Sequence, residues 1–310
     1  MPDPEILLRR LLNNTGSPFQ GVVVMTHWSG AHTQSEEARI VVAGPQRYRC
    51  EFLTPAGQIQ RVVVSNGGRE MVYLPTRRRI FSGASIGAGP QPPRGDMDLL
   101  ERNYEIRSVG TALVAGRPTW KVRLVPRAEG KPHQFLWIDQ ATGALLEIRR
   151  FLPDRPYAAS VRYTEYVPAP QNQKQLFELT DADLPIPEEH GLSPQFRSFE
   201  EMGSEGQVPA ELPYGFVFES GNRFTAQGHP VTQYCYTDGL ALLSLFQTPV
   251  PVQMSPRSNV DEMGEGAPLT IPPQMVQGER KGAHFTLLGD SSPALLQAVW
   301  ENMTPSPPAD

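Results

Sequence analysis

The sequence has 310 residues, with 28 basic and 33 acidic side chains and a formal net charge of −5 at pH 7. No stretch approaches the roughly 18–20 uninterrupted apolar residues that a membrane-spanning helix needs. Proline is about twice as common as usual, at 32 residues. Because proline disrupts helix interiors, we do not expect a purely helical bundle. At about 150 residues per domain, the length predicts two domains.

The net charge conceals a basic half and an acidic half. Residues 1–167 contain 22 basic and 15 acidic side chains, a balance of +7, whereas residues 168–310 contain 6 and 18, a balance of −12. This split favours two unlike domains and argues against a nucleic-acid binder. We expect the two halves to attract each other within one chain, through contacts that salt weakens.

In chain order, the first predicted element is a helix over residues 4–12, capped by Asp3. Strand patterns follow at 21–28, 46–53, 58–64 and 70–74. In the second of them Tyr48, Cys50 and Phe52 alternate with Arg47, Arg49 and Glu51. A Gly/Pro-rich loop at 81–96 and a short helix at 97–104 come next. The remaining strands of this half are predicted at 104–113, 118–126, 133–139, 144–151 and 158–166.

The second half changes character. Between Glu178 and Glu205 it has eight acidic residues and one basic residue, which predicts a linker with a short helix at 199–202. Strands at 214–220, 230–237, 240–246 and 283–288, a Pro/Met-rich excursion at 248–277 and a helix at 293–303 complete the chain. The predicted fold class is α+β. A large curved antiparallel sheet (1–167) leads through an acidic, Pro-rich linker (168–210) to a second, smaller unit (211–304) and a frayed tail (305–310).

Patterns for catalysis or metal binding are weak. Gly83–Gly87 fits the G-x-S-x-G nucleophile elbow, but the glycines and prolines that follow it cannot form the required helix. His27 and His32 are close in sequence and have no cluster of carboxylates beside them. Cys50 and Cys235 fit neither a disulfide framework nor a metal spacing, although their pairing stays open. We therefore expect no enzyme, no cofactor and no metal.

A broad sheet with so few helices leaves apolar surface to be covered. That surface must close on itself, dock another domain or hold an apolar ligand. The run Arg77–Arg79 is either a solvated turn or a contact for an anion, such as a lipid headgroup or an acidic partner segment. The candidate lipid-facing residues are Val22, Val24, Tyr48, Phe52, Tyr73 and Trp120.

Two groups of segments resemble known proteins. Tyr104–Gly110, Trp120–Leu124 and Phe135–Asp139 are similar to the end of lipoprotein-carrier domains of the LolA/LolB type. Leu212–Phe216, Tyr236–Leu240 and the strand 285–289 resemble the C-terminal domain of the RseB/MucB family. This similarity covers nearly the whole chain in the right order.

The resemblance implies a large LolA/LolB-like half-barrel (1–167) joined by the linker to a smaller α/β domain (211–304). It also implies a periplasmic, non-enzymatic regulator of an envelope-stress sigma factor. Such proteins bind the extracytoplasmic segment of a membrane anti-sigma factor, shield it from proteolysis, and are released by lipid or lipopolysaccharide. An acylated protein is a further candidate ligand. The candidate partner contacts are Tyr214, Phe216, Tyr234 and Tyr236. The alternative is a lipoprotein or lipid carrier of the LolA/LolB type, which would not need the acidic second half.

The N-terminus has neither a basic region nor an apolar segment of the kind found in signal peptides. The sequence alone therefore predicts either a cytosolic protein or a mature start preceded by an added Met. The resemblance favours a periplasmic or other extracytoplasmic location.

Overall fold

The computed structural model describes residues 2–13, 17–29, 32–44, 46–67, 69–84, 97–153, 157–168, 177–179, 188–189, 196–202, 208–251 and 274–303. Within these residues, no helix combines the length and the apolar character needed to cross a bilayer.

A large sheet contains the first twelve strands. They are β1 (Phe19–Ser29), β2 (His32–Gly44), β3 (Arg47–Leu53), β4 (Ile59–Asn66), β5 (Arg69–Leu74), β6 (Arg79–Ala84), β7 (Tyr104–Val114), β8 (Arg117–Pro126), β9 (His133–Asp139), β10 (Leu145–Phe151), β11 (Tyr157–Pro168) and β12 (Glu188–Glu189). Helices α1 (Pro4–Leu12) and α2 (Met97–Asn103) and the 3₁₀ turn η1 (Pro75–Arg77) accompany it.

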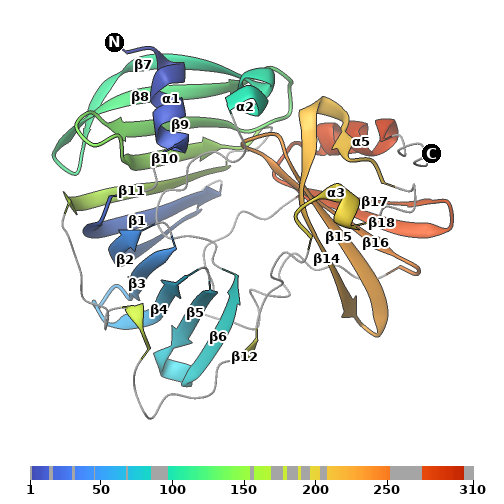
Figure 1. Ribbon diagram of the computed structural model, residues 1–310, viewed down its shortest axis with the longest axis horizontal. Coiled ribbons are helices and arrows are strands. Elements are labelled where there is room, and N and C mark those ends of the chain that lie inside the picture. The colour runs from blue at the N-terminus through green and yellow to red at the C-terminus, as the bar shows by residue number, and fades with distance from the viewer. Residues whose placement is uncertain are drawn as a thin grey trace.

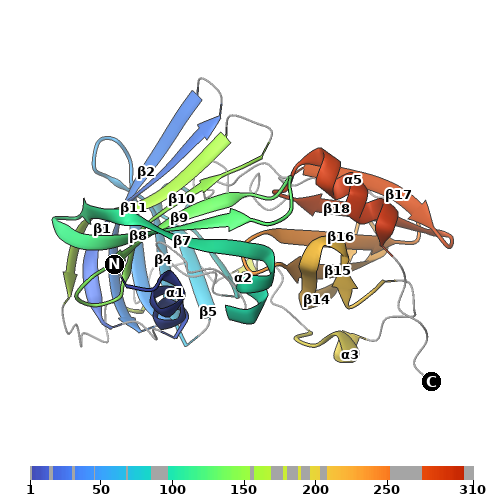
Figure 2. The same ribbon diagram turned by 90° about the horizontal axis from the view of Figure 1, so that it is seen from above.

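A small sheet contains the last six strands. They are β13 (Glu211–Leu212), β14 (Phe216–Ala226), β15 (His229–Thr237), β16 (Leu242–Thr248), β17 (Gln274–Arg280) and β18 (Ala283–Gly289). Helices α3 (Phe199–Met202) and α5 (Pro293–Asn302) and the 3₁₀ turn η3 (Pro213–Gly215) also belong to the described part of this unit. We call the two units the large lobe and the small lobe; they lie side by side in both views (Figure 1, Figure 2).

The large sheet is centred on β1. Its strand order is β12-β6-β5-β4-β3-β2-β1-β11-β10-β9-β8-β7, and the small sheet runs β13-β14-β15-β16-β18-β17. Every pairing in the large sheet is antiparallel except the short β12–β6 pair. The sheet curls strongly (Figure 2). The expectation of an α+β fold built on a large curved antiparallel sheet is confirmed.

Local sequence signals explain both long helices. Asp3 caps α1 by accepting a hydrogen bond from the backbone N–H of Glu5, and Pro4 occupies its first turn. Ser292 caps α5 in the same way, through the N–H of Leu295 at 3.1 Å. A side-chain acceptor at this position satisfies one of the backbone donors left free at a helix start.

Three of the longer strands differ from the sequence-based expectation. β2 was not expected, because the polar run from Gln34 to Glu37 hides its alternation. β6 lies partly in the segment expected to be a Gly/Pro-rich loop, and the first residues of β17 lie in the Pro/Met-rich excursion. β6 and β17 form strands because they hydrogen-bond to a neighbouring strand, β6 to β5 and β17 to β18.

Cross-strand register assigns the residues of the large sheet to two faces. On one face, Leu7, Leu8 and Leu11 of α1 pack on an apolar cluster that includes Val122 of β8 and Leu136 of β9. We call this the helix-side face, and α1 lies across β7–β10 in Figure 1. Following the register from Leu136 through β10, β11, β1 and β2 to β3 places Met25 and Phe52 on the same face.

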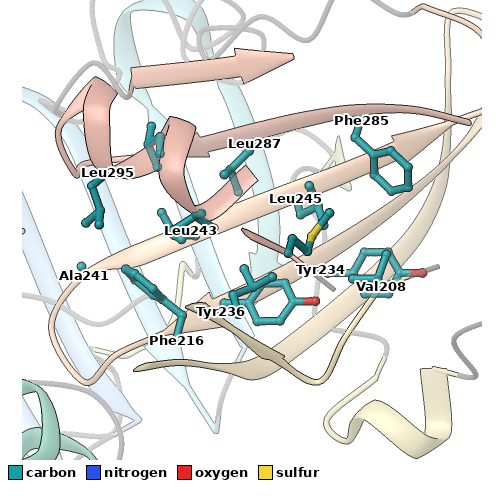
Figure 3. Packing of buried hydrophobic residues seen from close by; sticks show 14 of the residues in the cluster. Val208, Phe216, Tyr234, Tyr236, Ala241, Leu243, Leu245, Phe285, Leu287 and Leu295 are labelled. Carbon is teal, nitrogen blue, oxygen red and sulfur yellow. The ribbon is translucent and has the colours of Figure 1, made fainter. Parts of the chain in front are cut away.

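The small lobe has its own core. Phe216, Tyr236, Leu245 and Phe285 from the sheet meet Leu296 of α5 in one buried cluster, part of which is drawn in Figure 3. Described parts of the expected linker contact both lobes: β12 pairs with β6, and Phe196 bridges to Gly221 of β14.

Candidate functional site

The six candidate lipid-facing residues do not share one face. Tyr48, Phe52 and Trp120 lie on the helix-side face, whereas Val22 and Val24 lie on the opposite one. Tyr73 belongs with the valines, because Val22, Arg39, Glu51, Val62 and Tyr73 form one row across the strands. The six side chains therefore cannot line a single cavity.

The helix-side face is closed over much of its area by the protein itself. Helix α1 and Leu100 of α2 cover β8–β10, and Trp120 packs against this cluster. Towards β1–β4 the face carries half-buried apolar side chains that lie away from α1, namely Met25, Val42, Phe52 and Val63. These four are part of the half-buried apolar surface that this face carries away from α1, to which Phe19 and Val161 also belong.

The same face also holds buried charge. Arg61 is 2 % exposed, lies 3.4 Å from a carboxylate oxygen of Glu36, and places its guanidinium 3.6 Å from the centre of the Phe52 ring. Tyr48, also buried, donates a hydrogen bond to Glu70. Burial raises the pKa of the neighbouring Cys50 thiol to about 12. This part of the face is thus a paired polar cluster and not a continuous apolar trough.

The arginine run lies at the β5–β6 connection. Arg77 ends η1, Arg78 adopts a left-handed conformation with φ of 50°, and Arg79 begins β6. Arg77 and Arg78 are exposed and Arg79 is half-buried. The position fits an anion contact, although all three side chains also have interactions within the chain.

The four candidate partner contacts divide sharply by burial. Phe216 and Tyr236 are fully buried and Tyr234 is 4 % exposed; all three belong to the small-lobe core (Figure 3). Tyr214 is 41 % exposed. Only Tyr214 among them presents substantial surface to a partner.

Tyr214 lies at a seam between the lobes that sequence reasoning missed. The ammonium of Lys131, in the β8–β9 turn, lies 2.8 Å from a carboxylate oxygen of Asp238, which follows β15. Their side chains are 1 % and 0 % exposed. Tyr104 donates a hydrogen bond of 2.8 Å to the same carboxylate. Two members of this cluster lie in segments that carry a family resemblance, namely Tyr104 at the start of Tyr104–Gly110 and Asp238 within Tyr236–Leu240, whereas Lys131 had no sequence signal.

Further contacts extend the seam. Arg150 of β10 pairs with Asp290, which follows β18, and donates to the carbonyl of Leu240 at 3.1 Å. The backbone N–H of Ser292 donates to the carbonyl of Gly130 at 2.7 Å. Burial raises the pKa of Asp290 despite the nearby Arg150 guanidinium. In both ion pairs the cation comes from the basic half and the carboxylate from the acidic half.

The described residues contain no group of three His, Cys, Asp or Glu side chains placed to hold a metal. Ser85 of the G-x-S-x-G pattern and the side chain of His32 lie outside the described part of the structure. His27, on β1, is half-buried, and burial lowers its pKa. Cys50 and Cys235 are both free thiols.

The sequence of the large lobe matches the model of a known protein family. The sequence model of the MucB/RseB N-terminal domain matches residues 6–171, which is more than half of the chain. The chain belongs to the MucB/RseB family. Family membership agrees with the extracytoplasmic location expected from the resemblance. A search of curated proteins found no match.

Solved structures extend the likeness to both lobes. The complex of MucA and MucB from Pseudomonas aeruginosa is similar with a TM-score of 0.61 and 21 % identity, over 100 % of each chain. MucB in complex with MucA(peri) gives 0.59 and 20 %, over 98 % of this chain and 100 % of that one. MucB by itself gives 0.56 and 19 %, over 98 % of each chain. The shared fold therefore includes the small lobe.

Proposed function

We propose that this chain is a non-enzymatic envelope-stress regulator that binds the extracytoplasmic segment of an anti-sigma factor. The observation that carries the proposal is the similarity to MucB over the whole chain, because two of the similar structures are complexes with MucA. A carrier of the LolA/LolB type would need the large lobe alone, whereas the likeness here includes both lobes.

The test is binding of a recombinant extracytoplasmic segment from the anti-sigma factor encoded beside this chain. Isothermal titration should give a dissociation constant in the micromolar range or tighter. A protease that cuts the free segment should cut it more slowly once the chain is added. Absence of binding at micromolar concentrations, together with transfer of a lipidated protein between membranes, would instead support the carrier function.

The proposal includes a lipid ligand on the helix-side face. Its support is the half-buried apolar group Met25, Val42, Phe52 and Val63, which lies beyond the area that α1 covers. An acyl chain on these side chains would be removed from water, which is worth about 0.8 kcal/mol per buried methylene. The paired Arg61 and Glu36 at one side of this group would limit how far the chain extends.

Two neighbouring residues on β1 provide a matched pair for testing the lipid ligand. Met25 and Val24 are both half-buried and lie on opposite faces of the sheet. With a fluorescent sixteen-carbon fatty acid as the probe, Met25→Gln should weaken binding several-fold and Val24→Gln should leave it unchanged. Equal effects of the two changes, or no binding of the probe, would remove the lipid ligand from the proposal.

A further inference from the structure

The seam between the lobes is built so that one buried cation satisfies groups on both sides. Lys131 has three N–H donors, and three acceptors surround them: Asp238 at 2.8 Å, the carbonyl of Tyr214 at 2.7 Å and the side-chain oxygen of Asn103 at 3.1 Å. Two of these acceptors belong to the small lobe. Separating the lobes would leave the Lys131 ammonium and the Asp238 carboxylate without each other.

Asn103 makes a second bridge between the lobes. Its amide nitrogen lies 3.1 Å from the carbonyl of Gly215 and 3.1 Å from that of Asp238. Its side-chain oxygen would lie only 2.1 Å from a Cβ added at Gly215. A side chain at position 215 would displace the Asn103 amide, and the φ of 78° at Gly215 also favours glycine. The small-lobe turn η3 thus fits closely against the end of α2.

The turn that carries Tyr214 has an energetically unfavourable backbone conformation. Tyr214 has φ of 65° and ψ of 26°, the left-handed region that a non-glycine residue rarely adopts. Backbone strain of this kind persists only where the surroundings enforce it, and it concentrates at sites of function. Here the carbonyls of Tyr214 and Gly215 both accept hydrogen bonds from the large lobe. The large lobe thus fixes the shape of a small-lobe turn.

Tyr214 is also the one aromatic side chain among the large exposed apolar residues of the described chain. An exposed tyrosine offers a large, rigid contact surface, and tyrosine is enriched among the residues that dominate the energy of protein interfaces. An exposed aromatic ring on a strained turn, fixed by a desolvated network, has the features of a preorganised contact.

We propose that the Lys131–Asp238 seam is a latch that fixes the two lobes as one body, and that the Tyr214 turn is a contact surface for the anti-sigma segment that exists only while the latch is closed. The second half of this statement rests on the proposed function. The first half does not, because it concerns the chain alone. Opening of the latch would release the turn and weaken the partner contact without any change at the ring itself.

The latch is tested by distances between the lobes. Spin labels attached at Ala141→Cys in the β9–β10 turn and Ala294→Cys in α5, both exposed sites, report the separation when Cys235 is replaced by Ala. The intact chain should give one narrow distribution. Lys131→Met should broaden it, because Asp238 then loses its cation in a buried site. Arg107→Met, which breaks an exposed ion pair with Glu105, is the matched control and should leave it narrow.

A narrow distribution in Lys131→Met would overturn the latch. If that variant does not fold, the neutral pair Lys131→Met/Asp238→Asn replaces it, since the Asn oxygen can still accept from the N–H groups of Leu240 and Ala241 as Asp238 does now. This variant should also give a broader distribution than the intact chain, and an unchanged one would contradict the latch equally.

Affinity for the anti-sigma segment tests the contact surface. Tyr214→Ala should weaken binding at least tenfold with an unchanged distance distribution, and Lys131→Met should weaken binding at least tenfold with a broadened one. Unchanged affinity in Tyr214→Ala would overturn the contact surface while leaving the proposed function in place. If the intact chain binds no segment, the proposed function and the contact surface both fail, and the distances still decide the latch.

Discussion

Gly21 offers a sharp test of the large sheet, because it lies where the two ends of the large-lobe sequence meet. It pairs with Tyr166 of β11 and Ile40 of β2. A Cβ built on Gly21 would lie 2.2 Å from the carbonyl oxygen of Glu165, against 3.4–4 Å for an ordinary contact. The obstacle is backbone in a central strand, so Gly21→Ala must push β1 and β11 apart by roughly 1 Å.

Overpacking of this kind typically costs about 1–3 kcal/mol. With a urea m-value of about 2 kcal/mol per molar, a loss of 2 kcal/mol lowers the unfolding midpoint by about 1 M. The assay is urea denaturation followed by tryptophan fluorescence. The matched control is Gly44→Ala on β2, where an added Cβ meets nothing within 4 Å. That change should be neutral or stabilise the chain by up to about 1 kcal/mol.

Equal midpoints for Gly21→Ala and Gly44→Ala would refute the argument, because the close approach of β1 to β11 would then not exist in solution. A lower midpoint in both variants would also count against it, since the loss could not come from the Glu165 carbonyl. Only a loss confined to Gly21→Ala agrees with the described register.

Three further predictions concern single side chains. Leu8→Ala in α1, at a fully buried site, should lower the free energy of unfolding by about 2–5 kcal/mol, measured by the same denaturation; a loss below 1 kcal/mol would show that α1 does not cover the sheet. With a thiol reagent at pH 8, Cys235 should react first and Cys50 only on unfolding, because burial raises the Cys50 pKa to about 12; equally fast reaction of both would contradict the described burial. Burial opposes ionisation of Asp139, but hydrogen bonds, chiefly from Arg117, outweigh it and lower its pKa. Its contribution to stability is therefore full above the usual carboxyl pKa and is lost as pH falls through the lowered one, so Asp139→Asn should be less stable than the parent chain at pH 7, and the gap should close in acid.

The sequence predicted those elements whose signals are local. The α1 and α5 helices begin at side-chain caps, and the alternation of β3 places Tyr48 and Cys50 inside, as the structure shows. β2 was not predicted from the sequence. Its polar residues are compatible with a strand because β2 pairs with β1 on one side and β3 on the other, which is a tertiary effect.

The candidate site was harder to predict, since it depends on which residues meet across the chain. Tyr48 and Val22 both read as apolar strand residues, and only the register puts them on opposite faces. Lys131 and Asn103 are single polar residues in a turn and at a helix end, with no pattern around them. Their role depends on Asp238, more than a hundred residues away.

The charge split correctly predicted that basic side chains of the first half meet acidic side chains of the second. It did not predict that this contact is buried. Lys131 comes from the basic half and Asp238 from the acidic one, as expected, yet both are buried. Buried pairs are screened far less than exposed ones. We therefore expect ionic strength to have little effect on the arrangement of the lobes, contrary to the expectation from sequence.

The central place of β1 in the large sheet bears on how the chain is made. β2–β6 and β7–β11 are two meanders of sequential hairpins, and in the described sheet the ladder continues from one to the other where β1 pairs with β11. During synthesis or export from the N-terminus, one edge of β1 stays open until residues 157–168 emerge. An open, apolar strand edge is a site for wrong pairing and aggregation. Wrong pairing of the large sheet is thus most favoured in the interval before its last long strand, β11, becomes available.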